Sequence, residues 1–533
     1  MTDNFESPLL AADIAWSNDN SYYTGELPVI EVQGGGLSDE ATQAENALIS
    51  AKIPIYQRGN KLVRPIVQGV NATKNRKTTI ATLVGVTPER LTDALCKCAK
   101  WERYNAKIKG MVTINPPANI AKTILARGGD WKFKKVLGII TTPTLRPDGS
   151  ILDKLGYDEK TGLILIEYPK MPHIPNMPSM EEALKALGLL EDLISEFPFV
   201  DEYSRSVALS ALITPVVRGA MSVVPMHVMR ASTPGTGKSY LLDVAAAIAL
   251  GQPCPVMAAG RNEEETEKRL GAALIAGQQI ISLDNINGDL GGDSLCQIVE
   301  RILVQVRILG KSEQVTIEAN STIFATGNNI RLVGDMNRRA LVCTLDANVE
   351  RPELRKFDTN PVEKVLGNRG KYIAAVLTII RAYIVAGKPD LIIPKLASFE
   401  DWSDLIRSAL VWLGKADPVK TMESARAEDP FLQNLRAVLH SIEYSIGLDR
   451  PKTAKEIVDM ALDKEKYPDL YNAIATATGD RKEFITAKEL GKWLGRHEGR
   501  IIDNLKITKK NDNSGHGAKW WVTKSAVEAI ESG

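Results

Sequence analysis

The chain has little cysteine and little histidine, with five residues of each type among 533. Cys96 and Cys98 are close together, but no second pair of cysteines or histidines accompanies them, and His497 and His516 are isolated. This spacing argues against a structural zinc site. Scattered cysteines also argue against a disulfide framework and are typical of a reducing compartment, so we expect a cytoplasmic protein.

Long apolar runs and a strong net charge are also absent. The best candidate for a membrane span, 372–386, is interrupted by Arg381 and is too short, and no signal peptide is evident at the start. We therefore expect no membrane partner. The net charge is only +1, so any binding to DNA has to come from local basic patches. The content of 44% hydrophobic and 25% charged residues predicts ordinary globular domains.

Residues 1–51 lack Lys and Arg but contain many acids, with three consecutive glycines, 34–36, among them. This composition predicts a flexible acidic arm. A solvated tail is one interpretation. The other is an interaction segment, or one that shields a basic DNA groove.

A glycine-rich loop lies between an apolar stretch and a helix-forming run. Residues 226–231 read as a strand, Ser-Thr-Pro-Gly-Thr-Gly-Lys-Ser follows, and 240–250 favours a helix. Glycines let backbone N–H groups surround phosphate oxygens, and the helix adds its positive N-terminal end. The pattern predicts a P-loop that binds ATP, with Lys238 on the phosphates and Ser239 on Mg²⁺. The predicted nucleotide-binding residues are Pro234, Gly235, Thr236, Gly237, Lys238, Ser239 and Tyr240, and Ser232 replaces the usual first glycine.

A second apolar stretch, 279–283, ends in Asp284 and Asn285. An aspartate at this position completes the Mg²⁺ site of P-loop proteins, so Asp284 is predicted to act with Ser239. A glutamate usually follows and polarises the attacking water, but Asn285 can only orient that water. Glu264 is the nearest candidate base. The alternative is that the acids around it only stabilise the start of a helix.

Residues 304–319 alternate between apolar and polar on both sides of Lys311, which predicts a β-hairpin with Lys311 near its tip. An apolar strand then ends in Thr326, Gly327 and Asn328. With these motifs the chain resembles the AAA+ ATPases. The strings LDNING, ATGNN and MNRRALVCTLD are more closely similar to primase-helicase-like proteins of prophages, plasmids and other mobile elements, which are related to superfamily 3 and poxvirus-type helicases.

The resemblance implies a hexameric ring with ATP between subunits. It assigns Asn328 to sensor 1, which contacts the γ-phosphate, and Arg338 or Arg339 to the arginine finger of the neighbouring subunit. It also implies that the hairpin, with Arg307 and Lys311, reaches into a central channel that holds single-stranded DNA. Many relatives carry a primase domain, but residues 1–180 show no paired-carboxylate signature, so a primase would be a separate partner.

A helical lid should follow the ATPase core, and such lids usually supply a sensor 2 arginine. Arg369 and Arg407 are the candidates. Ahead of the core, 52–178 reads as a mixed α/β domain. Its residues 52–66 alternate as a hairpin would, with the turn at Gly59 and Asn60, and Thr87 is a candidate N-cap of a helix over 87–105. In that domain Trp131 and the lysines that follow it either bind single-stranded nucleic acid or form an ordinary amphipathic strand.

Residues 449–533 predict a winged helix, with helices at 453–462, 486–494 and 500–505 before a strand–turn–strand. Lys509 and Lys510 on the wing are expected to face DNA, and docking of a protein is the alternative.

The predicted architecture is therefore α/β, with an AAA+ P-loop core, a helical lid, a mixed α/β N-terminal domain and a C-terminal winged helix. The expected domains are 1–51, 52–178, 179–350, 351–448 and 449–533. The predicted function is ATP-dependent DNA unwinding, on single-stranded or forked DNA, for replication of a mobile element. Two alternatives remain open. One is an AAA+ loader or regulator, and the other is an origin-binding protein that uses ATP only for assembly.

Overall fold

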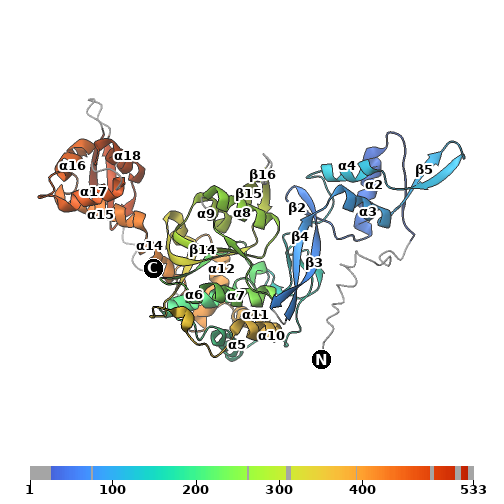
Figure 1. The fold of residues 1–533 in the computed structure, drawn as a ribbon, viewed down its shortest axis with the longest axis horizontal. Helices are drawn as coiled ribbons and strands as arrows, with labels where there is room; N and C mark the ends of the chain where they lie inside the picture. Colours follow the sequence, from blue (N-terminus) through green and yellow to red (C-terminus); the bar gives the residue numbers. More distant parts are fainter. Residues whose placement is uncertain are drawn as a thin grey trace. The chain divides into compact units, whose positions relative to one another are not determined.

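The computed structural model describes residues 26–73, 76–260, 263–307, 314–391, 393–479, 485–510 and 518–525. The chain divides into two compact units. The first contains the residues up to Ile330 together with Arg339–Met422, and the second contains Arg331–Arg338 together with Glu423–Gly533. Figure 1 shows the elements along the chain. None of the helices in the described residues is long and apolar enough to cross a membrane.

In its described residues, the N-terminal part of the first unit combines the helices α2, α3 and α4 with small sheets. Three of these sheets have the strand orders β1-β5-β6, β2-β3-β4 and β10-β11-β7, and β8 pairs with β9. The predicted turn at Gly59 and the helix cap at Thr87 are confirmed, since Thr87 Oγ1 accepts from the N–H of Arg90. The elements are β1 Val29–Glu31, α2 Leu37–Ser50, β2 Tyr56–Arg58, β3 Lys61–Thr73, β4 Arg76–Gly85, α3 Pro88–Cys98, β5 Lys100–Asn105, β6 Gly110–Ile114, α4 Ala118–Ala126, β7 Gly138–Ile140, β8 Thr144–Leu145, β9 Ile151–Leu152, β10 Gly156–Tyr157 and β11 Leu163–Leu165.

Helix α2 corrects the prediction of a flexible arm over 1–51. Its alanines and Leu48 are buried in a core that also contains Ile30 and Trp101. Two acids are structural rather than solvated, because Glu40 accepts from the backbone N–H of Gln33 and Glu45 is buried. Only residues 1–25 of the predicted arm lie outside the described residues.

The turn between β2 and β3 packs against helix α8 and strand β16. Arg58 is buried and donates to the carbonyls of Leu274 and Ile275, at the end of helix α8 (Glu263–Ile275). A Cβ on Gly59 would lie 2.6 Å from Cγ2 of Val315 and 3.2 Å from Cγ2 of Ile317. The turn therefore needs glycine, both for this contact and for its φ of 57°.

The core of the first unit is a five-stranded sheet with the order β13-β14-β17-β12-β18. The pairs β12–β17, β12–β18 and β13–β14 are parallel, and the register places Asn328 beside Ala231 and Asp284 beside Ala258. The predicted hairpin is present as β15–β16, whereas its tip with Lys311 lies outside the described residues. The elements along this part of the chain are α5 Met180–Leu193, α6 Glu202–Ile213, η1 Arg218–Ala220, β12 Met226–Ala231, α7 Lys238–Leu250, β13 Val256–Ala258, β14 Ile280–Leu290, α9 Asp293–Glu300, β15 Leu303–Arg307, β16 Gln314–Glu318, β17 Thr322–Leu332, β18 Ala340–Leu345 and η3 Pro352–Leu354. The short helix η2 Gly334–Arg338, between β17 and β18 in sequence, belongs to the second unit.

Helices follow the sheet in the sequence. Helix α11 is almost entirely buried and packs against α5 and α7. The elements are α10 Pro361–Gly367, α11 Arg369–Val385, α12 Glu400–Trp402, the π-helix η4 Ser403–Arg407, α13 Ser408–Trp412 and α14 Lys420–Ala427.

The second unit has helices around one core and an antiparallel sheet with the order β19-β22-β21-β20. Helix α15 belongs to this core, although the sequence suggested a boundary at 449. The helix predicted at 500–505 is wrong, because β20 and a turn lie there, and α17 is an additional helix. The elements are α15 Pro430–Ser445, β19 Lys452–Thr453, α16 Ala454–Ala461, α17 Pro468–Thr478, α18 Ala487–His497, β20 Ile501–Ile502, β21 Leu505–Lys510 and β22 Lys519–Lys524.

Candidate functional site: a phosphate-binding loop at the sheet edge

The loop 232–237 joins β12 to α7 at the carboxyl end of the strand. Gly235 and Gly237 have φ values of 77° and 98°, which favour glycine. Space is also limited, because a Cβ on Gly235 would lie 3.0 Å from Cβ of Glu353, and one on Gly237 would lie 3.3 Å from the Phe197 ring. Ligands of open α/β sheets bind outside this edge, so strand, loop and helix have the arrangement that phosphate binding needs.

Lys238 is the first residue of α7, and its ammonium group lies among neutral oxygens. Nζ donates to Oδ1 of Asn328 at 2.8 Å, to the carbonyl of Thr233 at 3.1 Å and to Oγ1 of Thr236 at 3.2 Å. Burial lowers the pKa of Lys238, and the charge of Asp284 opposes this shift. The structure thus brings Lys238 and Asn328 together, and none of these direct oxygen partners neutralises the lysine charge.

Ser239, Asp284 and Thr326 form the second part of the site. Ser239 Oγ lies 3.3 Å from Oδ1 of Asp284, and Thr326 Oγ1 donates to the same carboxylate oxygen. Mg²⁺ is usually held by one or two protein oxygens together with substrate phosphates. The hydroxyl of Ser239 and the carboxylate of Asp284 therefore fit a magnesium ion. Thr326 was not among the predicted site residues, and its place two residues before Asn328 was the available signal.

The backbone turns sharply where both strands pass the site. Asn285 and Asn329 have left-handed φ values of 58° and 49°, a conformation that asparagine tolerates well. Where β17 passes β14, a Cβ on Gly327 would lie 1.9 Å from the carbonyl oxygen of Ile286. Strands β14 and β17 therefore approach so closely that only glycine is possible, and Asn285 is presented at an exposed position.

Glu264, the candidate base, lies on the exposed first turn of α8. Its carboxylate accepts from Nζ of Lys268 at 2.6 Å, and this bond lowers the pKa of Glu264. The hydrogen bonds described for Glu264 thus connect it to its own helix and not to Asp284 or Lys238. This pairing is what the alternative interpretation, a charge cluster at a helix start, predicts.

The two candidate finger arginines have different surroundings. Arg339 is 5% exposed and donates through Nε to Glu300 at 2.8 Å. A side chain held in this way within its own subunit is a poor candidate for contact with a neighbour. Arg338 is exposed and pairs with Asp335 at 2.7 Å.

Both sensor 2 candidates are held by hydrogen bonds within the chain. Arg369 donates to the carbonyls of Ile248 and Ala249, at the end of α7, and burial lowers its pKa to about 10. Arg407 forms a bidentate salt bridge with Asp417, with 2.8 Å between its Nε and Oδ1. Neither arginine has a free guanidinium to offer a nucleotide.

The side chain of Tyr240 lies beside the loop. Its ring stacks on Phe197, with 6.4 Å between ring centres, and its hydroxyl donates to Asn360. Sequence reasoning missed Phe197 and Asn360, because nothing in their local sequence connects them with the loop. Pro234 lies within the loop and is exposed.

Two of the predicted DNA-contacting residues, Arg307 and Lys510, lie at strand ends. Arg307 is the last residue of β15 and is exposed, and Lys311 follows it outside the described residues. In the second unit, Lys510 is exposed at the end of β21 and Nζ of Lys509 lies 5.2 Å from the Trp520 ring centre.

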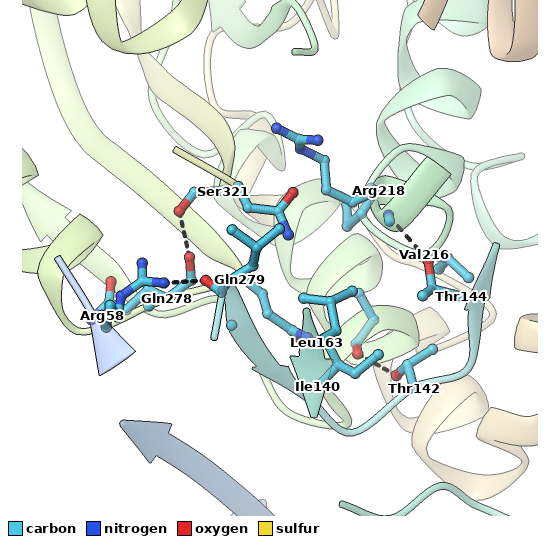
Figure 2. Close-up of a pocket in the computed structure, with 17 residues that line it drawn as sticks. Arg58, Ile140, Thr142, Thr144, Leu163, Val216, Arg218, Gln278, Gln279 and Ser321 are labelled. Carbon is cyan, nitrogen blue, oxygen red and sulfur yellow. Dashed lines mark hydrogen bonds between the residues drawn. The ribbon is translucent and has the colours of Figure 1, made fainter. Parts of the chain in front are cut away.

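A cavity of about 30 Å³ lies at the opposite edge of the sheet (Figure 2). Its lining residues Gln279 and Ser321 immediately precede β14 and β17. Arg58 and Arg218 also line it, and burial lowers the pKa of each to about 10. Both guanidiniums donate to backbone carbonyls, so this cavity is a packing gap that is separate from the P-loop.

No protein-family model matches the chain, and no curated protein matches it. Among solved structures, the A form apo structure of the NrS-1 C terminal region covers 83% of this chain and 100% of its own, at 13% identity and a TM-score of 0.36. SCCmec type IV Cch, an active helicase, covers 85% and 92%, at 11% and 0.30. JCV helicase covers 44% and 67%, at 12% and 0.19. Likenesses this weak do not establish the fold or the activity of this chain.

Proposed function

We propose that the chain is an ATP-dependent DNA helicase of the AAA+ type that works as a hexameric ring in the replication of a mobile genetic element. The observation that carries the proposal is the cluster of Lys238, Ser239, Asp284 and Asn328 at the carboxyl edge of the sheet. A cation, a hydroxyl–carboxylate pair and an amide are the groups that phosphoryl transfer to water uses.

Each group has a distinct role in this proposal. Lys238 binds the phosphates of ATP, Ser239 and Asp284 hold Mg²⁺, and Asn328 with Asn285 orients the attacking water. Water adds to the γ-phosphorus while the bond to the ADP oxygen breaks, which yields ADP, phosphate and a proton. Bound Mg²⁺ would neutralise phosphate charge. Because Glu264 is engaged by Lys268, we assign the larger share of catalysis to positioning.

Arg338 supplies the arginine finger to the ATP of the adjacent subunit. The hairpin β15–β16, with Arg307 and Lys311, contacts single-stranded DNA in the ring channel, and hydrolysis moves it along the strand. In the second unit, the helices and β21–β22 form a winged helix that contacts forked DNA through Lys509 and Lys510. The helices from α10 to α14 form the lid, and a separate primase is a fitting partner.

Strand displacement on a forked DNA substrate tests the proposal. We expect Lys238→Ala to abolish both ATP hydrolysis and unwinding, because the phosphates lose their cation. Lys185→Ala, an exposed lysine on α5, is the matched control and should leave both activities unchanged. Lys311→Ala should abolish unwinding and keep basal ATP hydrolysis.

The same assay separates the alternatives. Wild-type protein that hydrolyses ATP without displacing a strand would be a loader or regulator. Wild-type protein that binds ATP and assembles on DNA without hydrolysis would be an origin-binding protein, and the proposal would fail in either case.

A further inference from the structure

A second pocket, far in sequence from the P-loop, lies in the N-terminal part of the first unit. Its volume is about 430 Å³, within the range of small-molecule sites. The floor is apolar and is formed by Ile55, Phe133, Ile164 and Ile166, which are buried. Trp131, the aromatic residue that the sequence suggested for nucleic acid, does not line it, because the indole is buried and its Nε1 donates to the carbonyl of Ile124.

Two tyrosines supply flat aromatic surface in this pocket instead. The rings of Tyr56 and Tyr157 are stacked, with 5.5 Å between their centres and an angle of 21° between their planes. The hydroxyl of Tyr157 donates to the carbonyl of Lys135 at 2.8 Å, which fixes the ring. Both side chains are partly exposed, so a fixed aromatic platform faces the pocket.

The charged side chains that line the pocket are all basic. Its lining includes Lys52, Lys132 and Lys134, all exposed, and no Asp or Glu. Nζ of Lys134 lies 5.1 Å from the Tyr157 ring centre and 2.7 Å from Glu159. This ion pair is exposed and therefore weak, so another anion can replace Glu159 as the partner of Lys134.

We propose that this pocket binds an unpaired base of single-stranded DNA, which stacks on the Tyr56–Tyr157 platform while the lysines contact the flanking phosphates. Flat rings with interspersed lysines are the surface on which single strands bind without base specificity. A paired base is buried in its duplex stack and cannot enter. An acidic peptide would satisfy the lysines but would leave the aromatic platform without a planar partner.

The site would hold the single strand outside the ring channel. The inference rests on the proposed function only for the identity of the ligand. None of its lining residues belongs to the P-loop cluster. Its occupancy can therefore be measured without nucleotide and without ATP hydrolysis.

Fluorescence anisotropy of a labelled oligodeoxythymidylate with the full chain, in the absence of nucleotide, tests the inference. Tyr157→Leu removes the ring and keeps an apolar side chain, and it should weaken binding about fivefold to one-hundredfold. Tyr157→Phe keeps the ring and should bind within about twofold of wild type. Neither substitution should change binding to a blunt duplex.

Substitutions of two exposed lysines, one in the pocket and one outside it, provide a second test that does not disturb the core. Lys132→Gln should reduce the slope of log affinity against log salt by about 0.7, the value for one phosphate contact on a single strand. Lys122→Gln, an exposed lysine on α4 outside the pocket, should not change it. Wild-type affinity and salt slope in both Tyr157→Leu and Lys132→Gln would overturn the inference.

Failure of the two proposals gives different results. If wild-type protein lacks ATPase activity but Tyr157→Leu weakens oligonucleotide binding, the pocket is established and the helicase proposal fails. If ATPase and unwinding depend on Lys238 while the pocket variants bind normally, only the pocket is refuted.

Discussion

Arg338 and Arg339 are adjacent in sequence, yet their expected effects on stability differ. Arg339→Ala leaves the Glu300 carboxylate, 12% exposed, without its cation, so the free energy of unfolding should fall by about 3–5 kcal/mol. Arg338→Ala removes an exposed pair and should change it by less than about 0.5 kcal/mol. Urea denaturation followed by tryptophan fluorescence measures both. Equal losses in the two variants would contradict the assignment of a structural role to Arg339 alone.

His227 gives stability a dependence on pH. It is fully buried on β12, 2.9 Å from Oγ of Ser210, and burial lowers its pKa to about 3. The unfolded chain therefore binds a proton below about pH 6.5 that the folded chain excludes, so stability falls as the pH falls from there to about 3.

The comparison with His227→Phe isolates this contribution. Phenylalanine cannot titrate, and Ser210 keeps its bond to the carbonyl of Val207. In chemical denaturation at a series of pH values, wild type should lose up to about 1.4 kcal/mol per pH unit more than the variant between pH 6.5 and 3. Parallel pH profiles for the two proteins would show that His227 is protonated in the fold.

The glycine-rich loop between β12 and α7 could be predicted from sequence because its residues are consecutive. The roles of Arg369 and Arg407 could not be predicted, because each depends on a carbonyl in another segment of the chain, that of Ile248 for Arg369 and that of Pro394 for Arg407. Thr326 was visible only as part of a motif. Its bond to Asp284 depends on how two strands are placed side by side.

At the scale of elements, the spacing of β14 and β17 depends on Gly327. Gly327→Ala should lower the free energy of unfolding by about 1–3 kcal/mol, because its Cβ would meet the Ile286 carbonyl. It should also abolish ATP hydrolysis, because Thr326 and Asn328 are displaced from their partners. Gly188→Ala, in the interior of α5 with no atom within 4 Å of the new Cβ, is the control and should be neutral or stabilising. Full ATPase activity in Gly327→Ala would disprove this account of the strand spacing.

Helices and strands could be predicted from the sequence where a strong apolar–polar pattern lay within a short segment. The β2–β3 and β15–β16 hairpins followed from alternation on both sides of a glycine-containing turn. Helix α2 was missed because its buried face consists mainly of alanines, a weak apolar signal among acidic residues. The short strand β20 was taken for a helix because two isoleucines carry no periodicity.

At the scale of the whole molecule, a site shared between subunits predicts complementation. Lys238→Ala and Arg338→Ala should each lack ATPase activity alone, since every interface lacks one group. In a mixture of the two, about a quarter of the interfaces, by random pairing in a ring, would combine an intact Lys238 with an intact Arg338. ATPase activity should therefore reappear on mixing. Its absence at every ratio would mean that Arg338 acts within its own subunit or not at all.

The turn that contains Arg58 and Gly59 also limits where the protein can be truncated. A shortened protein that starts at 179 would leave the carbonyls at the end of α8 without their donor and would uncover Val315 and Ile317. Such exposed apolar strands are prone to aggregation. The composition of the sequence changes at residue 178, but the folded unit does not end there. A soluble fragment that contains the five-stranded sheet therefore has to retain the N-terminal residues as well.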